Sequence, residues 1–389
     1  MEFRTADWRE EFYEFDDVAY LDVSTQGPLP RAAVRALEAA VEWKKFPHRM
    51  PAGIYLDLPA RVRALLARLT GAEPDEIGIT TGASAGLAAV ASAIDWKPGD
   101  EVLVARGEFP MQFCTWAPLE AAGKLKLKVI APRGRFITAE DFLAHAGPRT
   151  RLVSASLVRF DDGSLLDAAR LAKGLAPLGA RLLLDVSQCA GAMPIDFRAL
   201  GADFGVCAGY KWLLGPYGTG FVWARRELLA ELRPGTFYWM GVEGAGDFSA
   251  LDFGPSASGA YSWRPPSTAR RWDAAETASF IHLAALEASL EFLRRAGVET
   301  VQAHNARLLE PLVERLPRDR CVLVSPREAA ARGPYVCLAA RTPEKTKQLY
   351  ERLREEKIFV ALRQNAIRVA PHLYNTPEDV ERVLRVLAA

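Results

Sequence analysis

The chain has 389 residues, of which half are hydrophobic and a quarter are charged, and its formal net charge is +1. This composition is typical of an ordinary globular protein with two domains, and it excludes a bulk electrostatic attraction to nucleic acid or acidic membranes. No apolar run approaches the ~20 residues that a membrane-spanning helix requires, and the first residues lack the basic and apolar segments of a secretion signal.

The cysteines and histidines bear on compartment and metal binding. The five cysteines are scattered, with no Cys-x-x-Cys pair, and the five histidines form no His-x-x-x-His pair. We therefore expect reduced thiols in a cytoplasmic protein, and neither a disulfide framework nor a bound metal.

The N-terminal part of the chain predicts an arm, a loop and two helices. Residues 1–20 mix polar and aromatic side chains and are expected to pack against a later part of the fold. Residues 20–30 have the pattern of a short strand that runs into a loop with a glycine and two prolines. Apolar residues at helical spacing predict helices over residues 34–41 and 62–69, and Gly71 would end the second helix.

A run of small residues at 80–86 is a candidate anion site. It follows a short apolar strand at 77–79 and precedes apolar residues at helical spacing, so it should begin a helix. Backbone N–H groups at a helix N-terminus bind anions readily when the side chains are small, and the Ser84 hydroxyl would add a donor. The alternative is a helix start selected only for close packing.

Further strands are predicted at residues 101–104, 125–130 and 151–156, with helices at 138–146 and 165–178. The strand at 125–130 alternates lysine with apolar residues, which indicates one solvated face near an edge of the sheet. The helix at 165–178 would cross over into the strand that follows it.

The next two strands end in the residues that carry the chemistry. The apolar run 182–184 predicts a buried parallel strand that ends in Asp185, and a second short run, 204–207, precedes Lys211. Carboxyl ends of parallel strands are where open α/β sheets hold ligands. A lysine forms a Schiff base with an aldehyde cofactor, and an aspartate keeps a pyridine nitrogen protonated. Taken singly, each could be a surface lysine or a turn aspartate.

The C-terminal part predicts two long helices and then a smaller mixed unit. The helices are expected over residues 278–295 and 301–316. Short strands are predicted at 322–324, 335–338 and 367–370, with helices between and after them.

The motifs around the lysine and the aspartate resemble a known family. Asp185-x-x-Gln188, Tyr210-Lys211-Trp212 and the glycine-rich run 215–220 are similar to class V aminotransferases. That group includes cysteine desulfurases, selenocysteine lyases and isopenicillin-epimerase-like proteins, all of fold type I and dependent on pyridoxal 5′-phosphate (PLP). The resemblance covers nearly the whole chain.

The resemblance implies an α/β fold with two domains. A three-layer αβα domain with a mostly parallel sheet would bind PLP over residues 20–268. A smaller α+β domain would combine residues 1–19 with residues 269–389.

The resemblance also implies the cofactor-binding residues. Lys211 would form the Schiff base with PLP, and Asp185 would hold the pyridine nitrogen. Gln188 would bind the ring oxygen, and Ala83 with Ser84 would contact the phosphate.

At several positions the chain departs from the family. Phe109 stands where many relatives have a histidine that stacks on the ring; it can stack but cannot donate a proton, and it could instead be a core aromatic. Tyr210 replaces a common histidine and still offers a phenolic O–H, whereas Ala208 replaces a serine or threonine and offers none. Whether Thr277 substitutes for the family's donor to the neighbour's phosphate is open.

Two arginines are candidate substrate contacts. Arg368 lies in a motif similar to the family's C-terminal one, where an arginine binds the substrate α-carboxylate as a planar fork; the alternative is an ordinary ion pair. Arg159 follows a strand near the place of a family asparagine, and it is either a substrate contact or a surface arginine. In the family, the region corresponding to residues 234–268 runs along the dimer interface.

The expected function is a PLP-dependent reaction of a small amino-acid substrate in a homodimer with shared active sites, with no nucleic-acid or membrane partner. Residues 364–366, where cysteine desulfurases need a mobile cysteine, contain none, and Cys321 with Cys337 lie in predicted strands. We therefore expect amino transfer. The alternatives are a cysteine-independent C–S lyase, an epimerase, or a PLP-binding protein without turnover.

Overall fold

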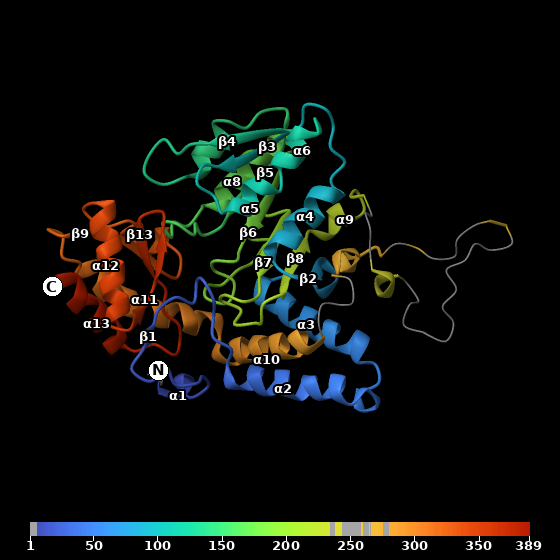
Figure 1. Cartoon of the computed structure of the whole chain (residues 1–389). Coiled ribbons are helices and arrows are strands. Elements are labelled where there is room, and N and C mark those ends of the chain that lie inside the picture. The colour runs from blue at the N-terminus through green and yellow to red at the C-terminus, as the bar shows by residue number, and fades with distance from the viewer. Residues whose placement is uncertain (1–5, 234–237, 243–257, 260–263, 265, 275–279) are drawn as a thin grey trace.

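A computed structural model gives the fold (Figure 1). It describes residues 6–233, 238–242, 258–259, 264, 266–274 and 280–389. Within these residues, no helix has both the length and the hydrophobicity that crossing a membrane requires.

The larger sheet contains most of the strands predicted before residue 230. Its order is β2-β8-β7-β6-β5-β3-β4, and only β8 runs against the others. The mostly parallel sheet expected from the sequence is thereby confirmed. The strands are β2 (Ile77–Thr80), β3 (Glu101–Ala105), β4 (Lys126–Ile130), β5 (Thr150–Ser156), β6 (Arg181–Asp185), β7 (Phe204–Ala208) and β8 (Gly220–Ala224).

Alternating side chains of these strands bury both faces of the sheet. Leu182 and Leu184 belong to one hydrophobic cluster and Leu183 to another, because successive strand residues point to opposite faces. The first cluster includes residues of α3, α7, α8 and α10, and the second includes residues of α4 and α9. Three layers result, as expected. The helices of this part are α1 (Ala6–Arg9), α2 (Arg31–Lys45), α3 (Ile54–Thr70), α4 (Ala83–Ala93), α5 (Pro110–Cys114), α6 (Ala117–Ala121), α7 (Ala139–Leu143), α8 (Ala168–Leu175), α9 (Arg226–Leu229) and α10 (Phe280–Ala296).

The edge strand β4 and the start of α8 bear on two of the sequence predictions. β4 lies at the edge of the sheet, as its alternating lysines indicate. The helix expected over 165–178 begins only at Ala168, because Asp167 caps it by accepting a hydrogen bond from the Arg170 N–H. Leu165 and Leu166 are instead engaged in backbone hydrogen bonds to distant residues.

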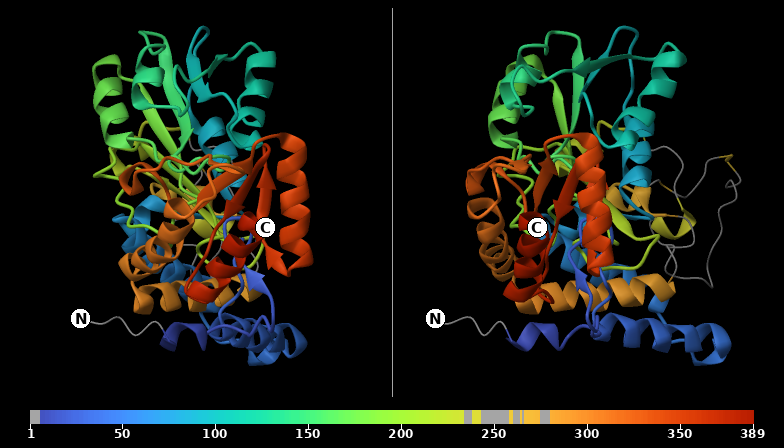
Figure 2. Two further views of the ribbon diagram at one scale, coloured as in Figure 1. Left: turned by 90° about the vertical axis from the view of Figure 1, so that its left-hand side faces the viewer. Right: turned by 60° about the vertical axis from the view of Figure 1, so that its left-hand side comes forward.

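A smaller α+β unit follows (Figure 2). Its antiparallel sheet has the order β12-β13-β10-β9, and α11, α12 and α13 supply residues to its separate hydrophobic cluster. A short parallel pair, β1 with β11, joins the N-terminal segment to this unit. The elements are α11 (Val298–Glu314), β9 (Cys321–Leu323), β10 (Val336–Ala340), α12 (Pro343–Glu355), β11 (Ile358–Phe359), β12 (Ala361–Arg363), β13 (Ala366–Val369), α13 (Pro377–Ala388) and β1 (Ala19–Tyr20).

The N-terminal arm and α10 connect the two units. Phe12 packs edge-on against Phe292 of α10 and against Tyr374, with ring centroids 5.3 and 5.2 Å apart. Buried residues of α10 belong to the cluster of the larger sheet, whereas the cluster of the smaller unit takes Ala19 and Leu21 from the N-terminal segment and, after α10, starts at Leu308 of α11. The domain boundary predicted at residue 269 stays a proposal, and this packing favours a boundary after α10.

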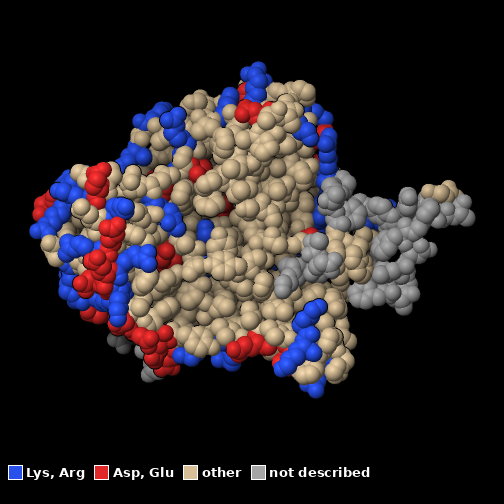
Figure 3. Space-filling model, viewed as in Figure 1, with Lys and Arg blue, Asp and Glu red and all other residues tan. Residues whose placement is uncertain are grey.

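The charged residues are unevenly distributed over the surface. In Figure 3, Lys and Arg side chains alternate with Asp and Glu over the C-terminal unit, whereas the adjoining middle of this face has few charges. Opposite charges in close mixture produce little long-range field, in keeping with the net charge of +1.

Candidate active site

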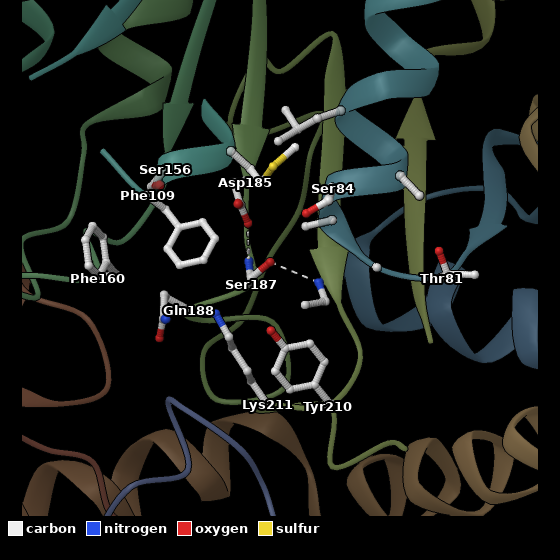
Figure 4. A pocket seen from close by; sticks show the side chains of 16 residues that line it. Thr81, Ser84, Phe109, Ser156, Phe160, Asp185, Ser187, Gln188, Tyr210 and Lys211 are labelled. Carbon is white, nitrogen blue, oxygen red and sulfur yellow. Dashed lines mark hydrogen bonds between the residues drawn. The ribbon is translucent and has the colours of Figure 1, made fainter. Parts of the chain in front are cut away.

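The carboxyl ends of three neighbouring parallel strands meet at one cavity. Asp185 is the last residue of β6 and pairs in register with Ser156, the last residue of β5. Lys211 follows the end of β7, which pairs with β6 on the side opposite β5. The cavity is lined by Thr81, Gly82, Ala83, Ser84, Ala85, Leu87, Phe109, Met111, Ser156, Phe160, Asp185, Ser187, Gln188, Ala208, Tyr210 and Lys211 (Figure 4).

Of the eight residues predicted to form the site, seven therefore share one cavity. They come from the α4 start, the β3–α5 junction and the loops after β6 and β7. Arg368 does not line this cavity.

Lys211 is a buried amine with a perturbed pKa. Its side chain is 8% exposed, and burial lowers the pKa of Lys211 to about 8, an effect that Asp185 opposes and Arg368 reinforces. Its Nζ lies 5.4 Å from the ring centroid of Phe109 and 5.8 Å from that of Tyr210. A lysine so enclosed exchanges its proton near neutral pH.

Asp185 is held in place by the turn that follows β6. Its Oδ1 accepts a hydrogen bond from the Ser187 N–H at 2.8 Å, and the Ser187 hydroxyl accepts one from the Ala208 N–H at 2.9 Å. These two contacts tie the end of β6 to the end of β7. Figure 4 shows the Asp185 carboxylate between Phe109 and Ser84, above Ser187.

Gln188 retains hydrogen-bonding capacity in a buried position. Its Nε2 donates to the Ser24 backbone oxygen at 3.2 Å, while its Oε1 is buried and has no partner among the described residues. An amide carries two N–H groups, so one donor and the carbonyl oxygen remain for another group.

The start of α4 offers the small-residue cradle that the sequence predicts. Ala83 and Ser84 form its first turn, after Gly82 in an extended, positive-φ conformation (φ 152°). A Cβ built on Gly82 would have no heavy atom within 4 Å, so the approach to these N–H groups is open. Tyr210 lines the cavity as well, with its ring 5.0 Å from that of Tyr217.

Phe109 is not a core aromatic, which corrects one of the two interpretations of its position. Its side chain is 39% exposed and lines the cavity, and its ring lies edge-on to Phe160 at 5.6 Å. One side of the ring therefore faces the cavity, where the Lys211 Nζ lies 5.4 Å from its centroid.

Arg368 lies next to the cavity through its contact with Phe160. Its Nη1 donates to the Phe160 backbone oxygen at 2.9 Å and its Nη2 to Thr25 Oγ1 at 2.8 Å, while Nε has no partner among the described residues. Asp22 Oδ1 lies 3.7 Å from Nη2, so the ion pair considered as an alternative is present as a loose one. Several donor positions of the fork remain open.

Arg363 is a second arginine at this place, which the sequence reasoning missed. Its Nη2 donates to the same Thr25 Oγ1 at 3.1 Å. Residues 364 and 365 both have positive φ, so β12 and β13 are joined by a tight turn with an arginine in each strand. The signal available in the sequence was Asn365, a residue type that hairpin turns of this kind favour.

Arg159 is not a surface arginine, so that interpretation was wrong. It is 5% exposed, forms two hydrogen bonds to Asp161 at 3.1 and 2.8 Å, and donates to the Gly107 backbone oxygen at 2.9 Å. Beside it lies buried Glu108, another residue that sequence reasoning did not select; burial raises the pKa of Glu108 and Arg159 opposes that rise.

Two predicted features fall outside the described residues. Thr277 is one of them, and most of the long segment 234–268 is the other. Between these two features, Asp273 forms a buried two-pronged ion pair with Arg63 at 2.7 and 2.8 Å.

Known proteins match this chain over most of its length. The isopenicillin N epimerase of Streptomyces clavuligerus is 28% identical over 409 residues, which cover 99% of this chain and 98% of the epimerase. The uncharacterized aminotransferase YcbU of Bacillus subtilis (strain 168) is 29% identical over 323 residues, which cover 83% of this chain and 81% of that relative.

A solved structure has the same fold. C-DES with glycine covalently linked to its PLP cofactor gives a TM-score of 0.85 at 23% identity, with 98% of each chain covered. This likeness confirms the predicted fold class.

The family assignment rests on a sequence match over most of the chain. The sequence profile described as "Aminotransferase class-V" matches residues 19–383, a range that includes Asp185, Lys211 and Arg368. The predicted resemblance and the predicted cofactor are thereby confirmed. The chain belongs to the class V aminotransferase family, whose enzymes depend on PLP.

Proposed function

We propose that the cavity holds PLP and that the protein transfers the amino group of an amino acid. The observation that carries the proposal is that Lys211 and Asp185 line one cavity from neighbouring strand ends. When bound, PLP supplies an aldehyde that links covalently to amines and a pyridine ring that draws electrons from the substrate Cα.

The residues of the cavity fit this cofactor. The buried Oε1 of Gln188 lacks a partner among the described residues, which is costly unless a ligand or water satisfies it. The open backbone at Gly82 gives an anion access to the α4 start. The remaining N–H of Gln188 can donate to the ring oxygen of PLP, and the phosphate can accept from the backbone N–H groups at the α4 start.

Each predicted residue has a role toward the cofactor. Lys211 would bind the aldehyde, Asp185 the ring nitrogen and Gln188 the ring oxygen. The Phe109 ring would stack on the pyridine face. The phosphate would be held by Ala83, Ser84 and Tyr210.

Lys211 would also move the substrate proton. With a pKa of about 8 caused by burial, roughly one lysine in ten is neutral at pH 7, compared with fewer than one in a thousand for an ordinary lysine. Only the neutral amine can accept a proton, so this shift prepares Lys211 to act as the base at the substrate Cα.

The substrate carboxylate would bind Arg368. A buried guanidinium whose Nε has no partner among the described residues offers a carboxylate two parallel N–H groups and stays charged at any working pH. Arg363, which shares Thr25 with Arg368, would keep this end of the site positive. The substrate is therefore oriented with its carboxylate toward Thr25 and its amine toward Lys211.

The proton-exchanging groups favour amino transfer over two-base epimerisation. Among the described residues that line the cavity, the titratable ones are Asp185, Tyr210 and Lys211, and none is a cysteine. Tyr210 and Lys211 are adjacent in the chain, and Figure 4 shows Phe109 across the cavity from them. One base at Cα suffices for transfer, whereas two-base epimerisation needs a second on the opposite face.

Two similar proteins make epimerisation and elimination the alternative reactions. Isopenicillin N epimerase aligns along nearly the whole chain, and one C-DES structure is described as a cystine C–S lyase with cysteine persulfide, its reaction product. Both epimerisation and elimination can start from proton removal at Cα. The test must therefore identify the product.

A panel of amino acids, read by the absorbance of the bound cofactor, tests the reaction. Pyridoxamine phosphate that a 2-oxo acid reconverts indicates transfer, ammonia with pyruvate indicates elimination, and inverted amino acid indicates epimerisation. If no amino acid changes the cofactor absorbance, the protein binds PLP without turnover.

Borohydride reduction tests the lysine. The wild-type protein should retain PLP covalently after reduction, and Lys211→Ala should not. An unchanged covalent adduct in the variant would refute the assignment of Lys211.

We also propose that the active form is a homodimer with shared active sites, as the family resemblance implies. Sedimentation of the PLP-loaded protein should give twice the chain mass of 42.7 kDa. A monomer with full activity would contradict the shared site.

A further inference from the structure

Phe109 is held from both sides by buried polar side chains. The residue before it, Glu108, contacts Ser156, and Gln112, one turn later in α5, accepts a hydrogen bond from the Ser154 hydroxyl at 2.5 Å. Ser154 and Ser156 are two residues apart on β5, so both hydroxyls point to the same face of the sheet. The segment that carries Phe109 is thus fastened to β5 at two points.

The contact of Glu108 uses both carboxylate oxygens. Oε1 accepts from the Ser156 N–H at 3.0 Å and Oε2 from the Ser156 hydroxyl at 2.7 Å. Oε2 also accepts from the Phe109 N–H at 3.3 Å. One side chain therefore joins the backbone of Phe109 directly to the end of β5, and Figure 4 shows Phe109 and Ser156 on the same side of the cavity.

Burying the Glu108 carboxylate costs folding free energy unless the side chain makes compensating contacts. The side chain of Glu108 is 3% exposed, and Arg159 Nη1 is 3.8 Å away, beyond hydrogen-bond distance. Burying a carboxylate is unfavourable unless hydrogen bonds and a nearby positive charge offset the loss of water. A shorter or apolar side chain could not bridge both donors of Ser156.

We propose that Glu108 is a positioning residue that fixes Phe109 in the cofactor cavity by bridging the N–H and O–H of Ser156. The proposal rests on the proposed function, because Phe109 matters there as the ring that stacks on PLP. It assigns Glu108 no contact with cofactor or substrate. The charged groups that act on the Glu108 carboxylate are Arg159, which favours its charged form, and Asp185, which opposes it.

The competing explanation is the charge of Glu108. Ser156 pairs in register with Asp185, so a negative charge on Glu108 could act on the ring nitrogen through space. Glu108→Gln separates the two, because the amide keeps the shape without the charge. Its carbonyl oxygen can accept from the Ser156 N–H and its NH2 can donate to the Ser156 hydroxyl oxygen, so the bridge to Ser156 remains while the contact with the Phe109 N–H is lost. If Glu108 works by holding Phe109, Glu108→Gln should bind PLP within about twofold of wild type.

A double-mutant cycle with Phe109 tests the proposal. The dissociation constant of PLP is measured by absorbance titration of the cofactor-free protein for wild type, Glu108→Ala, Phe109→Ala and the double variant. Glu108→Ala should weaken binding about threefold to tenfold when Phe109 is present, the range of an aromatic contact, and less than twofold when it is absent. Equal effects in both backgrounds, or a loss in Glu108→Gln as large as in Glu108→Ala, would overturn it.

Two further variants distinguish the loss of this contact from a general loss of folding. Ser156→Ala removes the hydroxyl partner without touching the acid and should also weaken binding only when Phe109 is present. Glu101→Gln is the matched control, because Glu101 is equally enclosed at the opposite end of β3, where it pairs with Lys128 and Arg149. Its PLP affinity should equal that of wild type.

Hydrogen exchange of the cofactor-free protein makes the proposal testable apart from the function. Glu108→Ala should speed exchange of the backbone amides of residues 109 and 111–114, and Glu101→Gln should not. If PLP binds no form of the protein, the proposed function fails while exchange still tests the positioning. Unchanged exchange in Glu108→Ala would overturn the positioning role even if PLP binds.

Discussion

Replacing Gly27 by alanine would disturb the substrate end of the site without touching a reacting group. The loop that contains Gly27 lies directly on the lysine segment: the Gly27 N–H donates to the Tyr210 backbone oxygen at 2.8 Å. The same loop carries Thr25, the shared acceptor of Arg363 and Arg368. Moving the loop should therefore move the carboxylate-binding arginines relative to Lys211.

The size of the disturbance follows from the local geometry. A Cβ at Gly27 would lie 2.2 Å from the Lys211 backbone oxygen, whereas real Cβ contacts essentially never fall below 3.0 Å, so something must shift by at least 0.8 Å. Gly27 has no positive φ, and alanine is therefore disfavoured by the contact alone. Overpacking of this kind costs about 1–3 kcal/mol of stability, and a misplacement near 1 Å can cost about 100-fold in rate.

The assay is the half-reaction of the PLP-loaded protein with the most active amino acid of the panel, followed by absorbance. We expect Gly27→Ala to lower kcat/KM by about 10- to 100-fold while PLP is still bound through Lys211. Gly134→Ala is the control, because a Cβ there would meet no heavy atom within 4 Å. If Gly27→Ala retains the kcat/KM and stability of wild type, the reasoning from loop to arginines is wrong.

Three further outcomes are expected. Because burial lowers the pKa of Lys211 to about 8, the rate of covalent PLP capture by the cofactor-free protein should rise with pH and level off above about 8; a rate still climbing at pH 9.5 in stopped-flow absorbance would contradict this. Asp273→Ala leaves the guanidinium of Arg63 buried and unpaired, so urea unfolding should show a loss of about 3–5 kcal/mol, and a loss below about 1 kcal/mol would mean that water replaces the acid. Asn365 has φ 66°, so Asn365→Val should cost about 1–2 kcal/mol in the same assay, whereas Asn365→Gly should be neutral or stabilising; equal stabilities of the two variants would exclude a strained turn.

Several features could be read from the sequence because their causes are local. The run 182–184 predicts a buried parallel strand from three large aliphatic residues in succession, and the structure places β6 there. The position of Asp185 and Lys211 after neighbouring strands follows from the same pattern. The small residues at 80–86 likewise predict the start of α4, because turn and capping preferences act over a few residues.

The tertiary structure alone decided which side chains share partners across the chain. Thr25 accepts hydrogen bonds from arginines more than 300 residues away, and Arg159, which could have been a surface residue, is enclosed between Gly107 and Asp161. The contact of Glu108 with Ser156 joins the ends of two strands 48 residues apart. Such partners depend on how whole elements pack, and periodicity and turn chemistry specify each element without specifying its neighbour. The sequence by itself therefore determined the elements and the cofactor chemistry, and packing decided how the site is held together.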